Sequence, residues 1–309
     1  MSKILVTGCN GFVGQHLVRE LAANGAEVVG VGGSSGTHEQ LPGLSSYIEA
    51  DLTDAAQAAK VDFSGVDGVI HLAGLAAVGP SFDNPELYMN VNVGIEVNLF
   101  ETAIAQNVRP RFLIISSGTL YDPKAPLPLT ETSTVDPSSS PYAASKVAQE
   151  SKALEYAKAG FEVMIARPFN HIGPGQGLGF IVPDIADQIV KVEKGEASEI
   201  LVGNLDAKRD YTDVRDIVRA YRLLIESGKS GEIYNLCTGK ARSGHEILEG
   251  LLNAAHDEIA VKQDPARMRP SDTPEIYGSH DKLTADTGWQ PEIDLQTTLA
   301  DVITDWRNR

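Results

Sequence analysis

Two side chains with acid–base chemistry, Tyr142 and Lys146, stand four residues apart. If the stretch 140–146, which reads S-P-Y-A-A-S-K, begins a helix, this spacing places both side chains on one face. A phenol ordinarily loses its proton near pH ~10, and a neighbouring ammonium favours the phenolate and lowers that pKa. We therefore expect Tyr142 to give or take a proton at a carbonyl or alcohol carbon. The alternative is an ordinary amphipathic helix after Pro141, because Tyr-x-x-x-Lys alone often arises by chance.

This chemistry requires a second hydroxyl group near the phenol, and Ser117 is the candidate. Ser117 follows a predicted strand over 111–116, and α/β sheets bind their ligands at the carboxyl ends of strands. We expect it to donate a hydrogen bond to the same oxygen that Tyr142 protonates. A serine in an ordinary strand-terminal turn is the alternative.

A dinucleotide site is predicted at the start of the chain. Residues 3–7 (K-I-L-V-T) are typical of a buried strand, residues 8–14 read G-C-N-G-F-V-G, and a helical pattern follows from 12 to 23. Glycines at this spacing allow a tight turn and close backbone approach to a pyrophosphate at a helix N-terminus. The alternative is a plain glycine-rich turn. The predicted cofactor contacts here are Gly8, Gly11, Phe12, Val13 and Gly14.

The choice between NAD and NADP depends on the second strand, predicted over 27–31. An acidic residue usually ends this strand when NAD is bound, but Gly32 stands there. The missing carboxylate slightly favours NADP, although no Arg or Lys follows to pair with a 2′-phosphate. Ser34, in the next loop, is assigned to the cofactor site. Asp51 and Leu52, after a third strand at 46–49, are expected near the adenine. A helix N-terminal acid is an equal alternative for Asp51.

The remaining elements position these residues. A strand over 68–74 ends in small residues, a helix over 84–106 is expected to break near Asn90, and a helix over 141–159 and a strand over 161–167 follow. Alternating strands and helices predict an α/β fold, a Rossmann doubly wound parallel sheet. Further cofactor contacts are assigned to Leu72, Ala73, Gly74, Asn92, Ser116 and Pro168, together with Tyr142 and Lys146.

The periodicity breaks at 168–175, where we expect the chain to leave the cofactor domain. Later segments return to the cofactor domain, with a helix to about residue 227 and a strand at 233–237. Helices at 243–255 and 295–309 follow. The predicted NAD(P)-binding domain comprises 1–167 and 205–238. A smaller C-terminal α/β domain for the substrate comprises 168–204 and 239–309.

Composition excludes several classes of protein. The formal net charge of −16 over 309 residues argues against nucleic acid or an anionic membrane surface as a partner. No run is long enough to span a bilayer, and no signal peptide is evident. Two cysteines, Cys9 and Cys237, exclude a disulfide framework and indicate a reducing, cytoplasmic compartment. No metal site is predicted.

The glycine loop, Ser117, Tyr142 and Lys146 together resemble the extended short-chain dehydrogenases/reductases that act on nucleotide sugars. The C-terminal half resembles GDP-6-deoxy-4-keto-D-mannose reductases, which make GDP-rhamnose. Three stretches carry this likeness, namely 166–176 (A-R-P-F-N-H-I-G-P-G-Q), 263–269 (Q-D-P-A-R-M-R) and 287–293 (T-G-W-Q-P-E-I).

The resemblance implies a catalytic Ser117, Tyr142 and Lys146. It places Ser117, Tyr142 and Asn170 against the substrate, with Arg209 and Arg269 on its diphosphate, whereas a surface ion pair is the alternative for each arginine. It also implies a homodimer formed by the helices over 84–106 and 141–159.

The sequence also departs from the family. Residues 71–92 look more like UDP-galactose 4-epimerases, and Asp122 replaces the usual glycine after Tyr121. The family's Asn-x-x-Gly-Thr corresponds to N-V-G-I-E at 92–96, so that Glu96 stands at the threonine.

We expect a reductase of the C4 ketone of a 4-keto-6-deoxy sugar nucleotide. The first alternative is a nucleotide-sugar 4-epimerase with the same residues. A more remote alternative is a non-catalytic NAD(P)-sensing protein, although such proteins commonly lose the Tyr or the Lys. Dehydration is not expected, because Gly118 and Thr119 stand where related dehydratases carry acidic residues.

Overall fold

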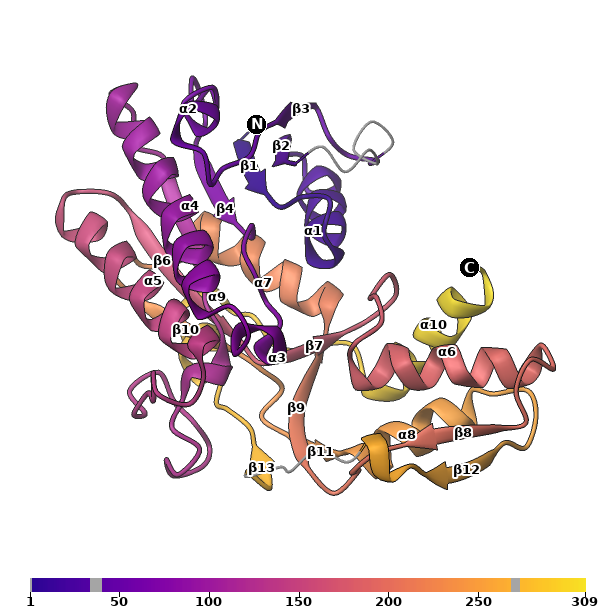
Figure 1. Ribbon diagram of the computed structural model, residues 1–309. Helices are drawn as coiled ribbons and strands as arrows, with labels where there is room; N and C mark the ends of the chain where they lie inside the picture. The colour runs from indigo at the N-terminus through magenta and orange to yellow at the C-terminus, as the bar shows by residue number, and fades with distance from the viewer. Residues whose placement is uncertain (1, 34–40, 268–272) are drawn as a thin grey trace.

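The computed structural model describes residues 2–33, 41–267 and 273–309, so Ser34 and Arg269 lie outside the described residues. Its largest sheet is parallel throughout and has the strand order β10-β6-β5-β4-β1-β2-β3 (Figure 1). The strands are β1 (Lys3–Thr7), β2 (Glu27–Gly32), β3 (Ser46–Glu49), β4 (Gly68–His71), β5 (Arg111–Ile115), β6 (Val163–Pro168) and β10 (Ile233–Leu236). This confirms the predicted doubly wound α/β sheet.

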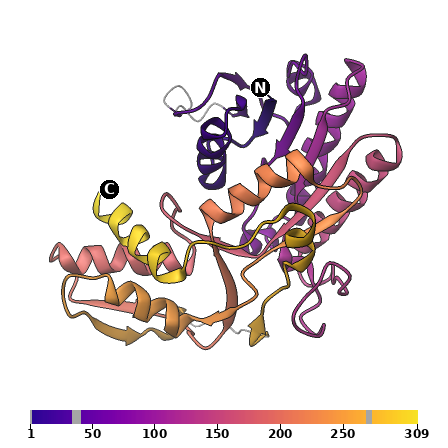
Figure 2. The ribbon, with the colours of Figure 1, turned by 180° about the vertical axis from the view of Figure 1, so that it is seen from behind.

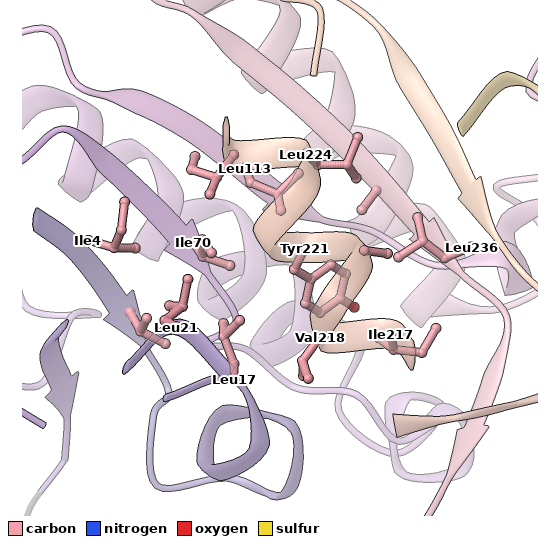
Figure 3. Packing of buried hydrophobic residues seen from close by; sticks show 14 of the residues in the cluster. Ile4, Leu17, Leu21, Ile70, Leu113, Ile217, Val218, Tyr221, Leu224 and Leu236 are labelled. Carbon is pink, nitrogen blue, oxygen red and sulfur yellow. The ribbon is translucent and has the colours of Figure 1, made fainter. Parts of the chain in front are cut away.

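Helices cover both faces of this sheet because its strands are apolar on both sides. Helices α1 (Phe12–Ala23) and α7 (Val214–Ser227) cover one face. Figure 2 shows the molecule from behind. Helices α2 (Ala55–Ala58), α4 (Pro85–Ala105) and α5 (Pro141–Lys158) cover the other. Figure 3 shows side chains of α7 and α1 packed with those of the strands; the labelled residues are Ile4, Leu17, Leu21, Ile70, Leu113, Ile217, Val218, Tyr221, Leu224 and Leu236.

A second, smaller group of elements lies beside the sheet (Figure 1). Its own apolar cluster joins α6 (Ile181–Glu193), α8 (Gly244–Asn253) and α10 (Leu295–Arg307) to the parallel pair of β8 (Glu199–Val202) and β12 (Ala260–Gln263). Strand β9 (Lys208–Asp213) runs between the two groups. It pairs with β7 (Asn170–Ile172), β11 (Ala241–Ser243) and β13 (Glu275–Ile276).

Some sequence expectations need correction. Helix α4 is continuous, and the break predicted near Asn90 is absent, because Asn90 is exposed and Asn92 is hydrogen-bonded to other elements. The stretch 168–175, predicted without regular structure, contains β7. The predicted domain division stays a prediction, but Leu283 of α9 (Asp281–Thr287) and Trp289 pack with the sheet cluster.

Among the described helices, none combines the length and the apolar character that crossing a membrane requires.

Candidate active site

The predicted phosphate loop joins β1 to α1 at the carboxyl edge of the sheet. Gly8 has φ +68°, and a Cβ there would lie 2.9 Å from the Ala73 nitrogen. A Cβ on Gly14 would lie 2.6 Å from the Cα of Cys9. No side chain caps α1 at Gly11, so the first N–H groups of the helix remain available to an anion. This backbone fits a dinucleotide pyrophosphate; the individual contacts of Gly8, Gly11, Phe12, Val13 and Gly14 stay predictions.

The loop after β4 lies beside this helix end and carries Leu72, Ala73 and Gly74. The Ala73 nitrogen donates to the Thr7 hydroxyl over 3.1 Å, which fixes the loop against β1. The predicted cofactor residue Asn92 is fully buried and accepts from the Leu75 nitrogen over 2.8 Å. Its amide nitrogen donates to the Ser145 hydroxyl over 3.0 Å. The structure therefore gives Asn92 a supporting role between this loop and helix α5.

Two further predicted residues end neighbouring strands of the same edge. Ser116 follows β5, is 3% exposed, and its hydroxyl has no hydrogen-bond partner among the described residues. Pro168 is the buried last residue of β6. A buried hydroxyl without a partner is uncommon in folded proteins. A cofactor bound along this edge would supply a partner for Ser116.

The adenosine end of the predicted site lies at the carboxyl end of β2 and the start of α2. Gly32 ends β2, and a Cβ there would lie 2.8 Å from the Tyr47 hydroxyl. Asp51 is exposed and accepts from the Thr53 nitrogen over 2.9 Å, while Asp54 caps α2. The helix N-terminal acid is therefore Asp54. Leu52 is buried against the sheet.

Helix α5 delivers the acid–base pair. Pro141 occupies the first turn, and the Ser140 hydroxyl accepts from the Ala143 nitrogen over 3.1 Å, which fixes the start of the helix. Tyr142 and Lys146 are 5% and 7% exposed, and the Lys146 ammonium lies 6.0 Å from the centre of the Tyr142 ring. The helix thus presents both side chains on one face, as predicted.

Ser117 and Tyr142 meet at the carboxyl end of β5, joined by a hydrogen bond. The Ser117 hydroxyl accepts from the Thr119 nitrogen over 3.1 Å and donates to the Thr119 hydroxyl over 3.0 Å. The Tyr88 ring packs edge-on against Tyr142 at 6.3 Å between centres. The structure therefore brings the predicted catalytic residues together and adds Tyr88, which sequence reasoning missed.

The protonation states differ from the sequence expectation. Burial raises the pKa of Tyr142 to about 12, although its bond to Ser117 lowers it. The expected lowering by Lys146 is not observed. Burial lowers the pKa of Lys146 to about 8, against the opposing effect of Glu96 and Glu150. At neutral pH Tyr142 is a phenol that can donate a proton, and Lys146 is an ammonium.

Lys146 is held from behind by the sheet and its own helix. Its ammonium donates to the Ile115 carbonyl over 2.8 Å and to the Gln149 side-chain oxygen over 2.9 Å. One turn further along the helix, Glu150 forms a buried two-point contact with Arg167 of β6, at 2.8 and 2.6 Å. These contacts fix α5 on the sheet. Sequence reasoning missed Gln149 and Glu150, although both follow Lys146 closely on the same helix.

A cavity of about 660 Å³ opens in the smaller group of elements. Arg209 of β9 lines it, and so does Arg267, which the sequence analysis did not single out although it lies in the stretch 263–269. Arg209 donates to the carbonyls of Lys208 and Thr273 over 2.7 and 3.1 Å. Two arginines at one cavity suit an anion such as a diphosphate. The other lining residues are Gly179, Ile181, Asp184, Ile185, Gln188, Leu201, Val202, Gly203, Asn204, Leu205, Ala207, Ala266 and Thr273.

The cavity and the acid–base residues occupy different places. Ser117, Tyr142 and Lys146 do not line the cavity, and the elements between are β7 and β9, which pair from Asn170 to Ile172. The predicted substrate residue Asn170 is exposed there and hydrogen-bonded to Tyr211. A substrate with an anionic end in the cavity and a reacting end near Tyr142 would pass Asn170.

Comparison with known proteins identifies the family of the chain. The sequence profile of the GDP-mannose 4,6 dehydratase family matches residues 5–302. The chain is 36% identical to the GDP-6-deoxy-D-mannose reductase of Pseudomonas aeruginosa, over 99% of this chain and 98% of the relative.

Solved structures of related proteins also match this chain over almost its full length. The structure of RMD from Pseudomonas aeruginosa complexed with NADPH has a TM-score of 0.89 and 34% identity, covering 100% of this chain and 99% of that one. UDP-glucose 4-epimerase from Bifidobacterium longum, in complex with NAD+ and UDP, has a TM-score of 0.87 and 28% identity, covering 99% and 98%. The chain therefore belongs to the GDP-mannose 4,6 dehydratase family and is an NAD(P)-dependent enzyme of the extended short-chain dehydrogenase/reductase type.

Proposed function

We propose that the protein reduces the C4 ketone of a 4-keto-6-deoxy sugar nucleotide, of the type that converts GDP-4-keto-6-deoxy-D-mannose to GDP-rhamnose. The observation that carries this proposal is the buried Tyr142 phenol, bonded to Ser117 and close to the Lys146 ammonium. A protonated phenol is the form that a ketone reduction needs. The reductase and the NADPH complex of Pseudomonas aeruginosa support this substrate class and favour NADP.

In this mechanism, bound NAD(P)H supplies the hydride that adds to C4. The Ser117 hydroxyl proton, which faces the Thr119 hydroxyl in the free protein, turns to the C4 oxygen when substrate binds. Tyr142 gives its proton to that oxygen as negative charge develops there. Lys146 binds the cofactor ribose and keeps positive charge near the phenol. Because the Ile115 carbonyl and Gln149 already orient the ammonium, its place is fixed before substrate arrives.

The same site argues against dehydration. A Cβ at Gly118 would lie 2.9 Å from the Phe169 ring, so an acidic side chain there would have to displace that ring. Thr119 carries only a hydroxyl, and Asp122 accepts from the Lys124 nitrogen over 2.8 Å within its own turn. We therefore propose that the chain lacks the acid–base pair for elimination across C5 and C6. Incubation with NAD and intact GDP-mannose or dTDP-glucose tests this: a 4-keto-6-deoxy product at enzymatic rates would overturn it.

A nucleotide-sugar 4-epimerase is the second candidate, favoured by the likeness to UDP-glucose 4-epimerase. Such an enzyme would oxidise C4 and then reduce it from the other face, with no net use of cofactor. A mass spectrum under native conditions separates the two. NAD that stays bound through purification would favour the epimerase, whereas an exchangeable NADP site would favour the reductase.

We also propose a homodimer through α4 and α5. Leu87, Met89 and Ile104 of α4 are 50%, 38% and 38% exposed and would supply apolar side chains to such an interface. Ala143 is fully buried within the subunit and is not part of this surface. Light scattering that reports a monomer mass at working concentration would reject the dimer. A cytoplasmic location is proposed from the free and buried Cys9 and Cys237.

A further inference from the structure

A buried arginine that has no role in the mechanism above joins the two segments that carry the acid–base residues. Arg167 of β6 is 4% exposed, and its Nε and Nη2 donate to the two carboxyl oxygens of Glu150 over 2.8 and 2.6 Å. Its Nη1 donates to the Tyr121 hydroxyl over 2.9 Å. The guanidinium also lies 4.9 Å from the centre of the Tyr121 ring. One planar group therefore contacts helix α5 and the segment after β5 at the same time.

On the helix side, this contact is made in line with the acid–base pair. Tyr142, Lys146 and Glu150 follow one another at intervals of four residues on α5, which places them along one face of the helix. All three are buried. Two parallel N–H···O bonds from one guanidinium fix the orientation of a carboxylate as well as its distance. A rotation or a slide of α5 would therefore break the Arg167 contact at the same time as it moved the Tyr142 phenol.

On the other side, the contact is made at the end of the turn that carries Ser117. Ser117 and Tyr121 flank a single turn of 3-10 helix, Gly118–Leu120. The Tyr121 hydroxyl accepts from Arg167 and donates to the side-chain oxygen of Asn235 on β10 over 2.6 Å. Tyr121 is buried, and its hydroxyl is thus held both as a donor and as an acceptor. This contact fixes the far end of the Ser117 turn against β6 and β10.

Stability alone does not account for a charged group at this place. A buried ion pair contributes little net stability, because the cost of removing both charges from water offsets their attraction. A guanidinium, however, has five N–H donors in one rigid plane, and a lysine ammonium cannot reproduce that geometry. Arg167 uses this plane for Glu150 and Tyr121, and its Nη1 also lies 3.3 Å from the Glu131 carbonyl oxygen. The arrangement favours a geometric role for the arginine.

We propose that Arg167 is a positioning residue, which sets the Ser117 hydroxyl against the Tyr142 phenol by holding Tyr121 and Glu150 on one guanidinium. The geometry that it maintains is the hydrogen bond between Ser117 and Tyr142. This inference rests on the acid–base roles proposed for those two residues. The arginine-lined cavity is formed by other residues, so the anchoring of a substrate there should not depend on Arg167.

The first test is steady-state kinetics with the sugar nucleotide that the wild-type protein converts. Arg167→Lys keeps a positive charge beside Glu150 but cannot reach Tyr121 as well. Because a small misplacement of reacting groups is costly, we expect kcat to fall about tenfold, with KM for the sugar nucleotide and NADPH affinity close to wild type. Tyr121→Phe keeps the ring and the ion pair and should lower kcat about threefold. The double variant should be no slower than Arg167→Lys, since both changes break one link.

Arg111→Lys is the matched control, because Arg111 lies at the opposite end of β5 and donates to the carbonyls of Glu226 and Gly228 over 3.2 and 2.5 Å. It should leave kcat unchanged even if it lowers the melting temperature. Wild-type kcat in folded Arg167→Lys would overturn the proposal. An equal loss of kcat in Arg111→Lys, a rise in KM that matches the fall in kcat, or additive effects of the two changes in the double variant would also overturn it.

Amide hydrogen exchange, followed by mass spectrometry without cofactor or substrate, tests the link without any assay of activity. Arg167→Lys should speed exchange both in 117–121 and in 140–150, whereas Tyr121→Phe should speed it in 117–121 alone. Unchanged exchange in both segments of Arg167→Lys would overturn the proposal. A wild-type protein that reduces no ketone would contradict the proposed function and leave this exchange result unaffected, so the two failures can be told apart.

Discussion

The acid–base edge of the sheet and the arginine-lined cavity are built in different ways. At the edge, Ser117, Tyr142 and Lys146 are at least nine-tenths buried, and backbone or neighbouring side chains hold each of them. In the cavity, Arg267 is exposed and Arg209 is half-buried, and they come from segments far apart in the chain. We therefore expect the reaction type to depend on the buried, hydrogen-bonded edge, and the choice of substrate to depend on the more open cavity. Substitutions in the two regions should therefore have separable effects on kcat and KM.

The largest expected effect is at the edge. Tyr142→Phe removes the proton donor and keeps the ring against Tyr88, so kcat should fall by about 10² to 10⁴-fold. Cofactor affinity should stay close to wild type when measured by fluorescence titration. Tyr88→Phe is the control, since its hydroxyl only donates to the Ala77 carbonyl over 2.6 Å. Near wild-type turnover in Tyr142→Phe would disprove the catalytic assignment.

In the cavity, Arg209→Ala should raise KM for the nucleotide sugar about tenfold, or ~1.4 kcal/mol, and change kcat little. The reason is that a guanidinium on the diphosphate binds ground state and transition state alike. Steady-state kinetics with saturating cofactor measure this. Arg109→Ala removes an exposed arginine that packs on Phe161 and serves as control. If Arg209→Ala lowers kcat and spares KM, the two regions are not separable as described.

The pH dependence of the reaction reports the protonation states at the edge. Reduction needs Tyr142 as phenol and Lys146 as ammonium, with pKa values of about 12 and about 8. Both forms are present together below the lower value. We therefore expect kcat/KM to be level below about pH 8 and to fall tenfold per pH unit as the pH rises through it. A rate that instead rises with pH through this range would mean that Tyr142 acts as phenolate.

The smallest effect is expected at the adenosine end. Gly32→Asp restores the carboxylate that usually accompanies NAD, and its Cβ would displace the ends of the Tyr47 and Asn10 side chains, at 2.8 and 3.2 Å. The ratio of kcat/KM for NADPH over NADH should fall about tenfold through repulsion of the 2′-phosphate. Gly32→Asn is the uncharged control. An unchanged ratio would show that the residue at position 32 does not affect discrimination between NADPH and NADH.

The sequence predicted the edge better than the cavity, for a physical reason. The strand ends of one parallel sheet must share an edge, so Gly8 after β1 and Ser117 after β5 could be placed together from periodicity and spacing. Tyr142 was predicted from the start of its helix and its spacing from Lys146. The cavity needs α6 against β8 and β9, and such long-range packing leaves no local signal. Arg267 was missed for this reason, and Arg269 lies outside the described residues.

The burial of the acid–base residues also could not be predicted from the sequence. The four-residue spacing of Tyr142 and Lys146 suggested a lowered phenol pKa, but the environment raises it. Glu96 of α4 is likewise fully buried, which its place in the sequence did not indicate. The spacing along the sequence shows which side chains share a helix face. Only the packing around that face determines their pKa values.

The product formed from GDP-4-keto-6-deoxy-D-mannose distinguishes a reductase from an epimerase. The protein is incubated with this ketone and NADPH or NADH, cofactor oxidation is followed by absorbance, and the sugar nucleotide is analysed by mass spectrometry and NMR. We predict one cofactor oxidised per ketone consumed and a GDP-6-deoxy sugar with a C4 hydroxyl. An unreduced ketone, together with interconversion of UDP-glucose and UDP-galactose without net cofactor use, would contradict the reductase and establish the epimerase.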